Sequence, residues 1–483
     1  MRRFAIERKS VLIAMAVLFA SLAAASADSP KKSTSAVANS RGAESETDSL
    51  SGNGQPGVSA FSSTLNTPLS TLNSRPSNPA ERGYRLLRTK AFLPADFDQD
   101  VFDDLWKVWP EPERSRAKNA TPEQRRKMAF SRYGLMEAPE RKTGPAFGYV
   151  DDGNGGWVMN CFACHAGKVA GKMIPGAPNT HIALATLTDD VRLTKLKLGK
   201  KLTHLDLGSL KIPLGDSIGV TNSVIFGVAL GALRDEHMNV VIPFSMPALI
   251  HHAMDAPPWW NVRKKPMLYC DGFSPKNARV LLQFILIPQN SPKTIKSWEQ
   301  DYRDILAYIE SCKPPEYPWK VNSRLAERGR TVFTNQCSRC HGTYGKNATY
   351  EQTIVPIEEI GTDPVRLEAL SVESRRKIQK SWMSHYGKDK VILDPGGYVA
   401  PPLDGIWASA PYFHNGSTPT LWHVLHPEKR PAVWKRTENG YDREKVGLEV
   451  TSFEKLPENI KRADLRRLYY DTSIKGKSNS GHR

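Results

Sequence analysis

Apolar positions recur at helical spacing in several parts of the chain. Thr121-Pro122-Glu123-Gln124 places Thr as N-cap, Pro at the first helical position and Gln at the third, which predicts a helix running to Tyr133. Apolar residues between positions 298 and 309 predict a helix that opens at Ser291 and ends near Cys312, because Pro314-Pro315 cannot continue it. Residues 325–333 carry a third apolar face, on a helix that leads into Cys337.

The first 80 residues have a different pattern. A basic start is followed by the apolar run Val11 to Ala25 and by Ala25-Ser26-Ala27, which together predict a signal peptide over residues 1–27. An uncleaved anchor is the alternative. Residues 28–80 are rich in Ser, Thr, Asn, Gly and Pro, and predict a disordered leader. We therefore expect a periplasmic or secreted protein with no membrane span after cleavage.

Two short motifs indicate the chemistry. Cys161-Phe162-Ala163-Cys164-His165 and Cys337-Ser338-Arg339-Cys340-His341 both have the spacing of a c-type haem attachment site. The two thiols form thioethers with the haem vinyl groups, and the adjacent His binds iron. Zinc ribbons place their CxxC units about 15–20 residues apart, so the wide separation here disfavours zinc. We expect two covalently bound c-type haems, held by Cys161, Cys164, Cys337 and Cys340, with His165 and His341 as proximal ligands.

The overall composition says less about function than the motifs do. The formal net charge is +17, which fits either a solvated basic surface or attraction to an acidic redox partner. No nucleic-acid-binding module is recognisable, so we expect no nucleic acid partner. The two cysteines outside the motifs, Cys270 and Cys312, are consistent with a disulfide in an exported protein or with two buried thiols.

Three residues are candidates near the first haem. His181 follows the first motif closely and is either a ligand on the far side of that haem or a hydrogen-bonded or surface histidine. Trp259 and Trp260, in a segment bounded by prolines, suit a wall beside a flat cofactor or an ordinary aromatic core. The catalytic residues themselves are not determined by these patterns.

The motifs and two later segments resemble a known family. Two CxxCH motifs followed by Gly361-Thr362-Asp363-Pro364 and by Ala410–Ser417 (APYFHNGS) resemble the dihaem cytochrome c peroxidase and MauG superfamily. Three segments are similar to its RoxA-like (rubber oxygenase-like) branch: Cys161–Pro178, Pro257–Gly272 and Leu403–Thr420. The resemblance covers roughly residues 82–483, with gaps.

The resemblance implies a mainly α fold with two cytochrome c-type haem domains and long loops. We place these at residues 81–318 and 319–483, divided in the Pro-rich stretch 313–320. In the peroxidases, a Met beyond a His-x-Gly segment, which is His414-Asn415-Gly416 in this chain, is the sixth ligand of the electron-transfer haem. The last Met here is Met383, ahead of His414, so a nitrogen ligand is expected instead. His414 is our first candidate and His482 the second; the remaining candidates are His385, His423 and His426.

The function that follows is a haem-dependent oxidoreductase of peroxidase-like or dioxygenase-like type. The family implies peroxide or dioxygen chemistry at the N-terminal haem and electron transfer through the C-terminal one. A redox partner protein or a small electron donor would supply electrons. The alternative is a pure electron carrier in which both haems are six-coordinate.

Overall fold

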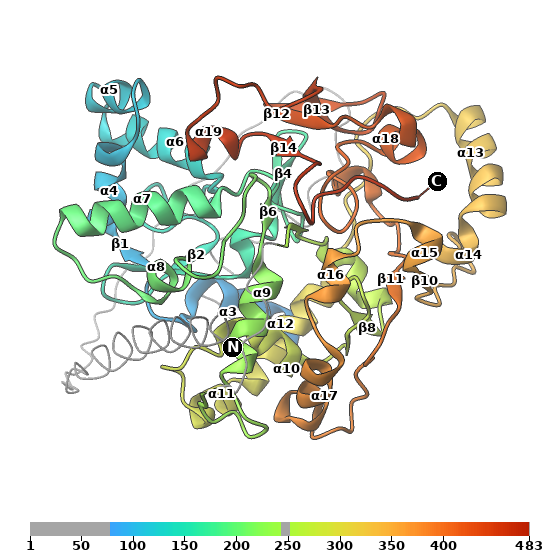
Figure 1. The fold of residues 1–483 in the computed structure, drawn as a ribbon, viewed down its shortest axis with the longest axis horizontal. Coiled ribbons are helices and arrows are strands. Elements are labelled where there is room, and N and C mark those ends of the chain that lie inside the picture. Colours follow the sequence, from blue (N-terminus) through green and yellow to red (C-terminus); the bar gives the residue numbers. More distant parts are fainter. Residues whose placement is uncertain (1–77, 243–251, 483) are drawn as a thin grey trace, which may run out of the picture. The chain divides into compact units, whose positions relative to one another are not determined.

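The computed structural model describes residues 78–242 and 252–482. These described residues belong to one compact unit, drawn as a ribbon in Figure 1. The predicted signal peptide and nearly all of the predicted leader lie outside the described residues; helix α3 begins at Pro79, just inside the leader's expected end. In the described ranges, no helix is long and apolar enough to cross a membrane. The predicted division of the chain within residues 313–320 stays a prediction.

Helices of four to fourteen residues make up much of the described chain. They are α3 (Pro79–Thr89), α4 (Gln99–Asp104), α5 (Glu113–Lys118), α6 (Pro122–Tyr133), α7 (Leu184–Lys197), α8 (His204–Gly208), α9 (Ser223–Ala232), α10 (Ala278–Leu281), α11 (Pro292–Ser297), α12 (Glu299–Ser311), α13 (Ser323–Gln336), α14 (Ser338–His341), α15 (Ile357–Ile360), α16 (Val365–Glu368), α17 (Val372–Lys380), α18 (Leu421–Leu425) and α19 (Ala463–Arg466).

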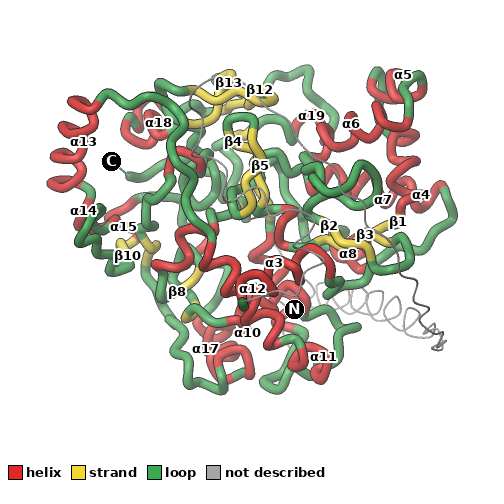
Figure 2. The backbone as a smooth tube through the Cα atoms, turned by 180° about the vertical axis from the view of Figure 1, so that it is seen from behind, coloured by secondary structure: helices red, strands yellow, loops and turns green. Residues whose placement is uncertain are grey.

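Small antiparallel sheets of two or three strands lie between these helices. Figure 2 shows strands, in yellow, as short separate pieces among loops. One three-stranded sheet has the order β1 (Phe97–Asp98), β3 (Gly156–Met159), β2 (Tyr149–Asp151), and another has the order β13 (Gly447–Phe453), β12 (Val433–Asp442), β14 (Tyr470–Asp471). The pairs are β4 (Ala166–Val169) with β5 (Lys172–Pro175), β6 (Val220–Thr221) with β7 (Met254–Asp255), β8 (Met267–Leu268) with β9 (Ser274–Pro275), and β10 (Ile354–Pro356) with β11 (Gly397–Val399).

This architecture corrects the expected mainly α fold with two cytochrome c domains. The described residues carry several small sheets, and no clear pair of mainly helical cytochrome domains is visible in that part of the chain. The physical reason is that most of these strands are two to four residues long, too short to leave a period-two pattern. Their stability also depends on partners that lie far away in sequence.

The predicted helices are confirmed with adjusted ends. α6 has the expected capping box, in which the Thr121 and Gln124 side chains each accept from the other residue's backbone N–H. The helix expected from Ser291 is two helices, α11 and α12, separated at Trp298. α12 ends at Ser311, before the prolines. α13 runs directly into Cys337 as predicted.

The main core forms where α3 crosses α12. Gly83 lies so close to α12 that a Cβ there would be 2.0 Å from the Asp304 carbonyl oxygen, which requires glycine at this crossing. Arg82 adds an ion pair to the Asp304 carboxylate, with Nε 2.8 Å from Oδ2. The same core includes two residues of the first candidate site, Phe162 and Trp259. The core therefore fixes the position of the first CxxCH motif.

A buried charge cluster stabilises the second half of the molecule, and its removal gives a first testable prediction. The buried Asp271 carboxylate is 2.6 Å from Arg375 and 3.2 Å from Arg366, both also buried. We expect Asp271→Ala to lower the free energy of unfolding by about 3–5 kcal/mol, because two buried guanidinium groups lose their anion. Urea unfolding measures this loss. Asp394→Ala, at an exposed aspartate, is the control and should change stability by about 0.5 kcal/mol or less.

Candidate haem sites

The first motif follows the end of strand β3 as a tight turn. The Asn160 side chain caps a 3-10 helix over Cys161–Ala163, with Oδ1 accepting from the Phe162 N–H at 2.9 Å. The backbone N–H of His165 then donates to the Cys161 carbonyl at 3.0 Å. This turn brings the thiols of Cys161 and Cys164 and the imidazole of His165 together on one short segment.

The imidazole of His165 is oriented by a backbone carbonyl. Its Nδ1 is 3.1 Å from the carbonyl oxygen of Pro257. Because a carbonyl only accepts, Nδ1 carries the proton and Nε2 keeps its lone pair for a metal ion. Burial lowers the pKa of His165 to about 4, so the ring is neutral near pH 7, which is the form that binds metals.

The second motif repeats this arrangement. Cys337, Cys340 and His341 lie at the junction of α13 and α14, and the His341 N–H donates to the Cys337 carbonyl at 3.0 Å. The Nδ1 of His341 is 2.8 Å from the carbonyl oxygen of Pro401. Here too Nε2 is the nitrogen available to iron. A hydrogen bond of this kind holds the ring orientation of a metal-binding histidine.

These carbonyl partners were not identified from the sequence, although a signal exists. Pro257 and Pro401 are each the first proline of an Ala-Pro-Pro tripeptide, at residues 256–258 and 400–402. A residue that precedes proline is confined to extended backbone. The repeated tripeptide could therefore have been associated with the repeated CxxCH motif.

The surroundings of the second motif fit a large apolar group. None of the α13 residues is buried, and Leu325 and Val332, predicted to form its apolar face, are 55% and 59% exposed. Figure 1 shows α13 at the edge of the molecule. Exposed apolar surface beside two thiols and an oriented imidazole is consistent with a haem bonded to Cys337 and Cys340.

The ring of His482 lies near that of His341. Their ring centroids are 6.2 Å apart, at an interplanar angle of 47°. A metal ion held between two opposed imidazoles lies about 2 Å from one nitrogen of each ring, which separates the ring centroids by about 6 Å. The distance between His341 and His482 therefore fits one iron bound by both. Burial lowers the pKa of His482, and the nearby His341 and Arg430 add to this effect, so its ring is also neutral near pH 7.

His414 has different surroundings. Its ring lies over that of Tyr398, with centroids 4.5 Å apart, and its backbone carbonyl accepts from the Asp255 N–H at 3.0 Å. Burial lowers the pKa of His414 to about 3, and Arg366 contributes. The ring contact of His414 is thus with Tyr398, whereas that of His482 is with His341.

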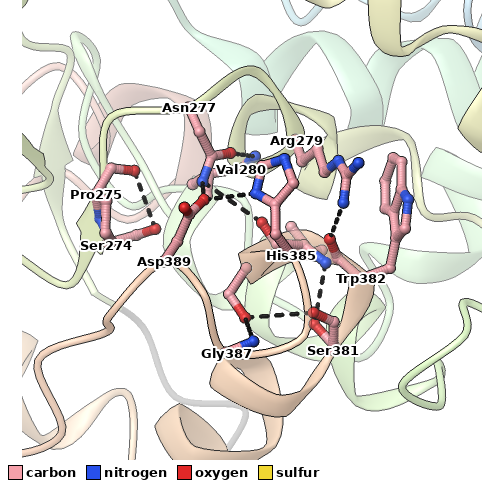
Figure 3. A network of polar contacts seen from close by, with 12 residues as sticks. Ser274, Pro275, Asn277, Arg279, Val280, Ser381, Trp382, His385, Gly387 and Asp389 are labelled. Carbon is pink, nitrogen blue, oxygen red and sulfur yellow. Dashed lines mark hydrogen bonds and ion pairs between the residues drawn. The ribbon is translucent and has the colours of Figure 1, made fainter.

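The remaining histidine candidates make local polar contacts. Figure 3 shows His385 with its Nδ1 directed at the Asp389 carboxylate, 2.7 Å away, in a network that includes Asn277. The Nδ1 of His423 is 2.7 Å from the Thr420 hydroxyl, and that of His426 is 2.8 Å from the Trp422 carbonyl. In each of these three histidines, Nδ1 is therefore bonded to a side chain or carbonyl of a residue three or four positions away.

The three candidates for the first haem have different surroundings. Trp259 is buried and stacks on the ring of His165, with centroids 5.0 Å apart. Trp260 is buried in a second cluster with Trp407, and its indole N–H donates to the Asp404 carbonyl at 2.7 Å. His181 donates from Nε2 to the carbonyl of Glu438 at 2.8 Å, as expected for the hydrogen-bonded alternative. Of the three, Trp259 contacts the motif.

The two cysteines outside the motifs are free thiols. Cys312 lies beside Trp259 and Gly176 and donates weakly to the Tyr308 carbonyl at 3.5 Å. Cys270 directly precedes Asp271, and its carbonyl accepts from the N–H of Val399, in strand β11, at 2.7 Å. Burial raises the pKa of Cys270 to about 11 and that of Cys312 to about 12. Of the two alternatives, the structure has free thiols, and both cysteines are partly buried.

Comparison with known families identifies a cytochrome c-like segment that includes Pro401, the carbonyl partner of His341. Residues 397–435 match the family described as "RoxA-like, cytochrome c-like". The match begins at β11, includes Pro401 and His414, and ends just after β12 begins. A cytochrome c-like segment implies covalently bound c-type haem and a redox function for the chain.

Two curated relatives come from Sinorhizobium fredii. "Uncharacterized protein y4iM" is 29% identical over 221 residues, which cover 40% of this chain and 49% of that protein. "Uncharacterized protein y4iJ" is 26% identical over 227 residues, which cover 35% of this chain and 36% of that protein. The chain thus spans half or less of the length of these relatives.

Proposed function

We propose that this protein is an exported dihaem c-type cytochrome that acts as an oxidoreductase on peroxide or dioxygen. Cys161 and Cys164 would hold one haem, and Cys337 and Cys340 the other. The observation that carries the proposal is the difference between the two proximal histidines. The ring of His341 faces a second imidazole at a distance that fits shared iron, whereas the ring of His165 stacks on Trp259.

This difference supports different roles for the two sites. An indole offers no lone pair to iron, so Trp259 restrains the His165 ring without competing as a ligand. A c-type haem supplies a redox-active iron that binds small oxygen species where an axial position is open and transfers electrons where both are held. His165, whose ring contact among the described residues is with an indole, suits the first use. His341 with His482 suits the second.

Buried aromatic rings form one side of the first site. Phe162, within the motif, is buried against Phe147, with ring centroids 4.7 Å apart, and against Trp259, at 5.4 Å. These rings belong to the main core. An apolar surrounding limits solvent access to a bound iron and so influences its redox potential. The Pro257 carbonyl, by orienting His165, would hold that ligand in position during turnover.

Location and partner are part of the same proposal. Haem attachment to CxxCH takes place outside the cytoplasm, which agrees with the predicted signal peptide and a periplasmic or secreted location. The net charge of +17 suits an acidic redox protein as electron donor.

The experiment that tests the proposal is a carbon monoxide difference spectrum of the purified, dithionite-reduced protein. Carbon monoxide binds ferrous haem where the sixth position is open or weakly held, so we expect about one haem in two to respond. Peroxide and dioxygen turnover assays would then follow. If neither haem responds, both irons are firmly six-coordinate and the protein is an electron carrier.

A further inference from the structure

The C-terminal tail, defined here as residues 476–482, ends at the candidate ligand His482. Residues 477–482 belong to no helix or strand, so the position of His482 depends on contacts that the tail makes with the rest of the protein. The start of the tail is anchored by Lys477, whose buried Nζ is 2.5 Å from the Ser217 hydroxyl and 3.2 Å from the Asp216 carboxylate.

Asn415, in the His-Asn-Gly-Ser segment, binds the tail through its side chain. Asn415 is completely buried, and its Nδ2 donates to the carbonyls of Gly476, at 3.3 Å, and Ser478, at 2.9 Å. Its Oδ1 accepts from the Ser417 N–H at 3.1 Å, which fixes the orientation of the amide. Only a side chain that both donates and accepts makes this set of bonds.

Asp363, in the Gly-Thr-Asp-Pro segment, holds the same point of the tail from another side. Its Oδ2 accepts from the Ser478 N–H at 3.0 Å, and its Oδ1 accepts from the Val365 N–H at 2.9 Å. Both polar backbone groups of Ser478 are therefore bonded to buried side chains, one from each segment.

Arg430 fixes the last residues of the tail. Its Nη1 donates to the carbonyls of Asn479, at 2.6 Å, and Gly481, at 2.7 Å. The same guanidinium donates to the carbonyls of His423 and Val424, both at 2.9 Å. The planar fork of arginine thus joins helix α18 to the tail. Figures 1 and 2 both show the C-terminus beside α18.

The final contact leaves no room for a side chain. A Cβ at Gly481 would be 2.5 Å from the Thr362 nitrogen and 2.6 Å from the Ile360 oxygen, and Gly481 has φ +88°. Glycine permits this approach, and the next backbone N–H, that of His482, donates to the Ile360 carbonyl at 2.8 Å. The backbone is thereby fixed directly at the residue whose ring faces His341.

We propose that Asn415, Asp363 and Arg430 are positioning residues that hold His482 opposite His341 and so determine the ligation of the second iron. The inference rests on the proposed function, in which His482 is a ligand. Asn415 and Asp363 lie in the two segments that carry the family resemblance. In this proposal both residues act at the second haem and not at the first.

The test uses the full-length holoprotein with Asn415→Asp. This change keeps the size of the side chain but directs a carboxylate oxygen at the Gly476 and Ser478 carbonyls, so the two hydrogen bonds are lost. We expect the reduced variant to bind about twice as much carbon monoxide per chain as the unmodified protein, as His482→Ala would, and to lose low-spin ferric signal from one haem. Because the effect acts through His482, the double variant that carries both Asn415→Asp and His482→Ala should have the spectrum of His482→Ala alone.

Asn119→Asp makes the same chemical change at an exposed residue and should leave the spectrum unchanged. Asp363→Asn leaves one acceptor oxygen for two N–H donors, those of Val365 and Ser478, and is a second variant that decides the matter if Asn415→Asp does not fold. If His482→Ala alters ligation but Asn415→Asp and Asp363→Asn do not, the positioning role is overturned and the ligand assignment stands. If His482→Ala itself changes nothing, the ligand assignment fails as well.

Discussion

Replacing both Cys337 and Cys340 with serine is expected to halve the covalently bound haem of the protein, from about two haems per chain to about one. Serine hydroxyls do not form thioethers with the haem vinyl groups, while the first motif, with Cys161 and Cys164, keeps its own attachment site. The measurement is a pyridine haemochrome assay on protein produced with a cytochrome c maturation system, together with the intact mass of the chain.

The chain provides its own controls for this experiment. Cys270 and Cys312 are free thiols outside the motifs, so Cys270→Ser and Cys312→Ser should keep both haems. The paired change at Cys161 and Cys164 should also leave one haem. A haem content that does not fall when either motif is changed would contradict the assignment of that motif.

His482→Ala is expected to convert the second haem from six-coordinate to open. Without the imidazole that lies 6.2 Å from the His341 ring, the ferrous iron has an exchangeable position, and the carbon monoxide bound per chain should rise about twofold. The midpoint potential of that haem should change at the same time, because the axial ligand is a main determinant of potential. Spectroelectrochemistry and carbon monoxide titration measure the two effects.

Two other histidines make this result specific. His237 is exposed, and His237→Ala should leave the spectra and the potential unchanged. His414→Ala tests the other candidate directly, since His414 packs on Tyr398 rather than beside His341. Loss of low-spin signal in His414→Ala, with none in His482→Ala, would make His414 the ligand.

Local sequence patterns predicted the helices well. The capping box at Thr121 and Gln124 forms as expected, and α12 ends before Pro314 as the prolines require. These features depend on residues within one or two helical turns of each other. The small sheets were not predicted, and for that reason the expected mainly α fold was wrong. The residues of β12 and β14, for example, pair across a long stretch of sequence, as Trp434 does with Tyr470.

The candidate haem sites divide in the same way. The sequence by itself determined the two candidate attachment motifs, since the residues proposed for thioether formation and proximal ligation lie within a single turn of chain. Only the tertiary structure determined which groups surround each imidazole: the carbonyls of Pro257 and Pro401, and His482 opposite His341. The physical reason is that an irregular tail has no intrinsic conformation. The tail that carries His482 is held by Asn415 and Arg430, which donate to the carbonyls of Ser478 and Gly481, and by Asp363, which accepts from the Ser478 N–H. These contacts exist only after the chain has folded.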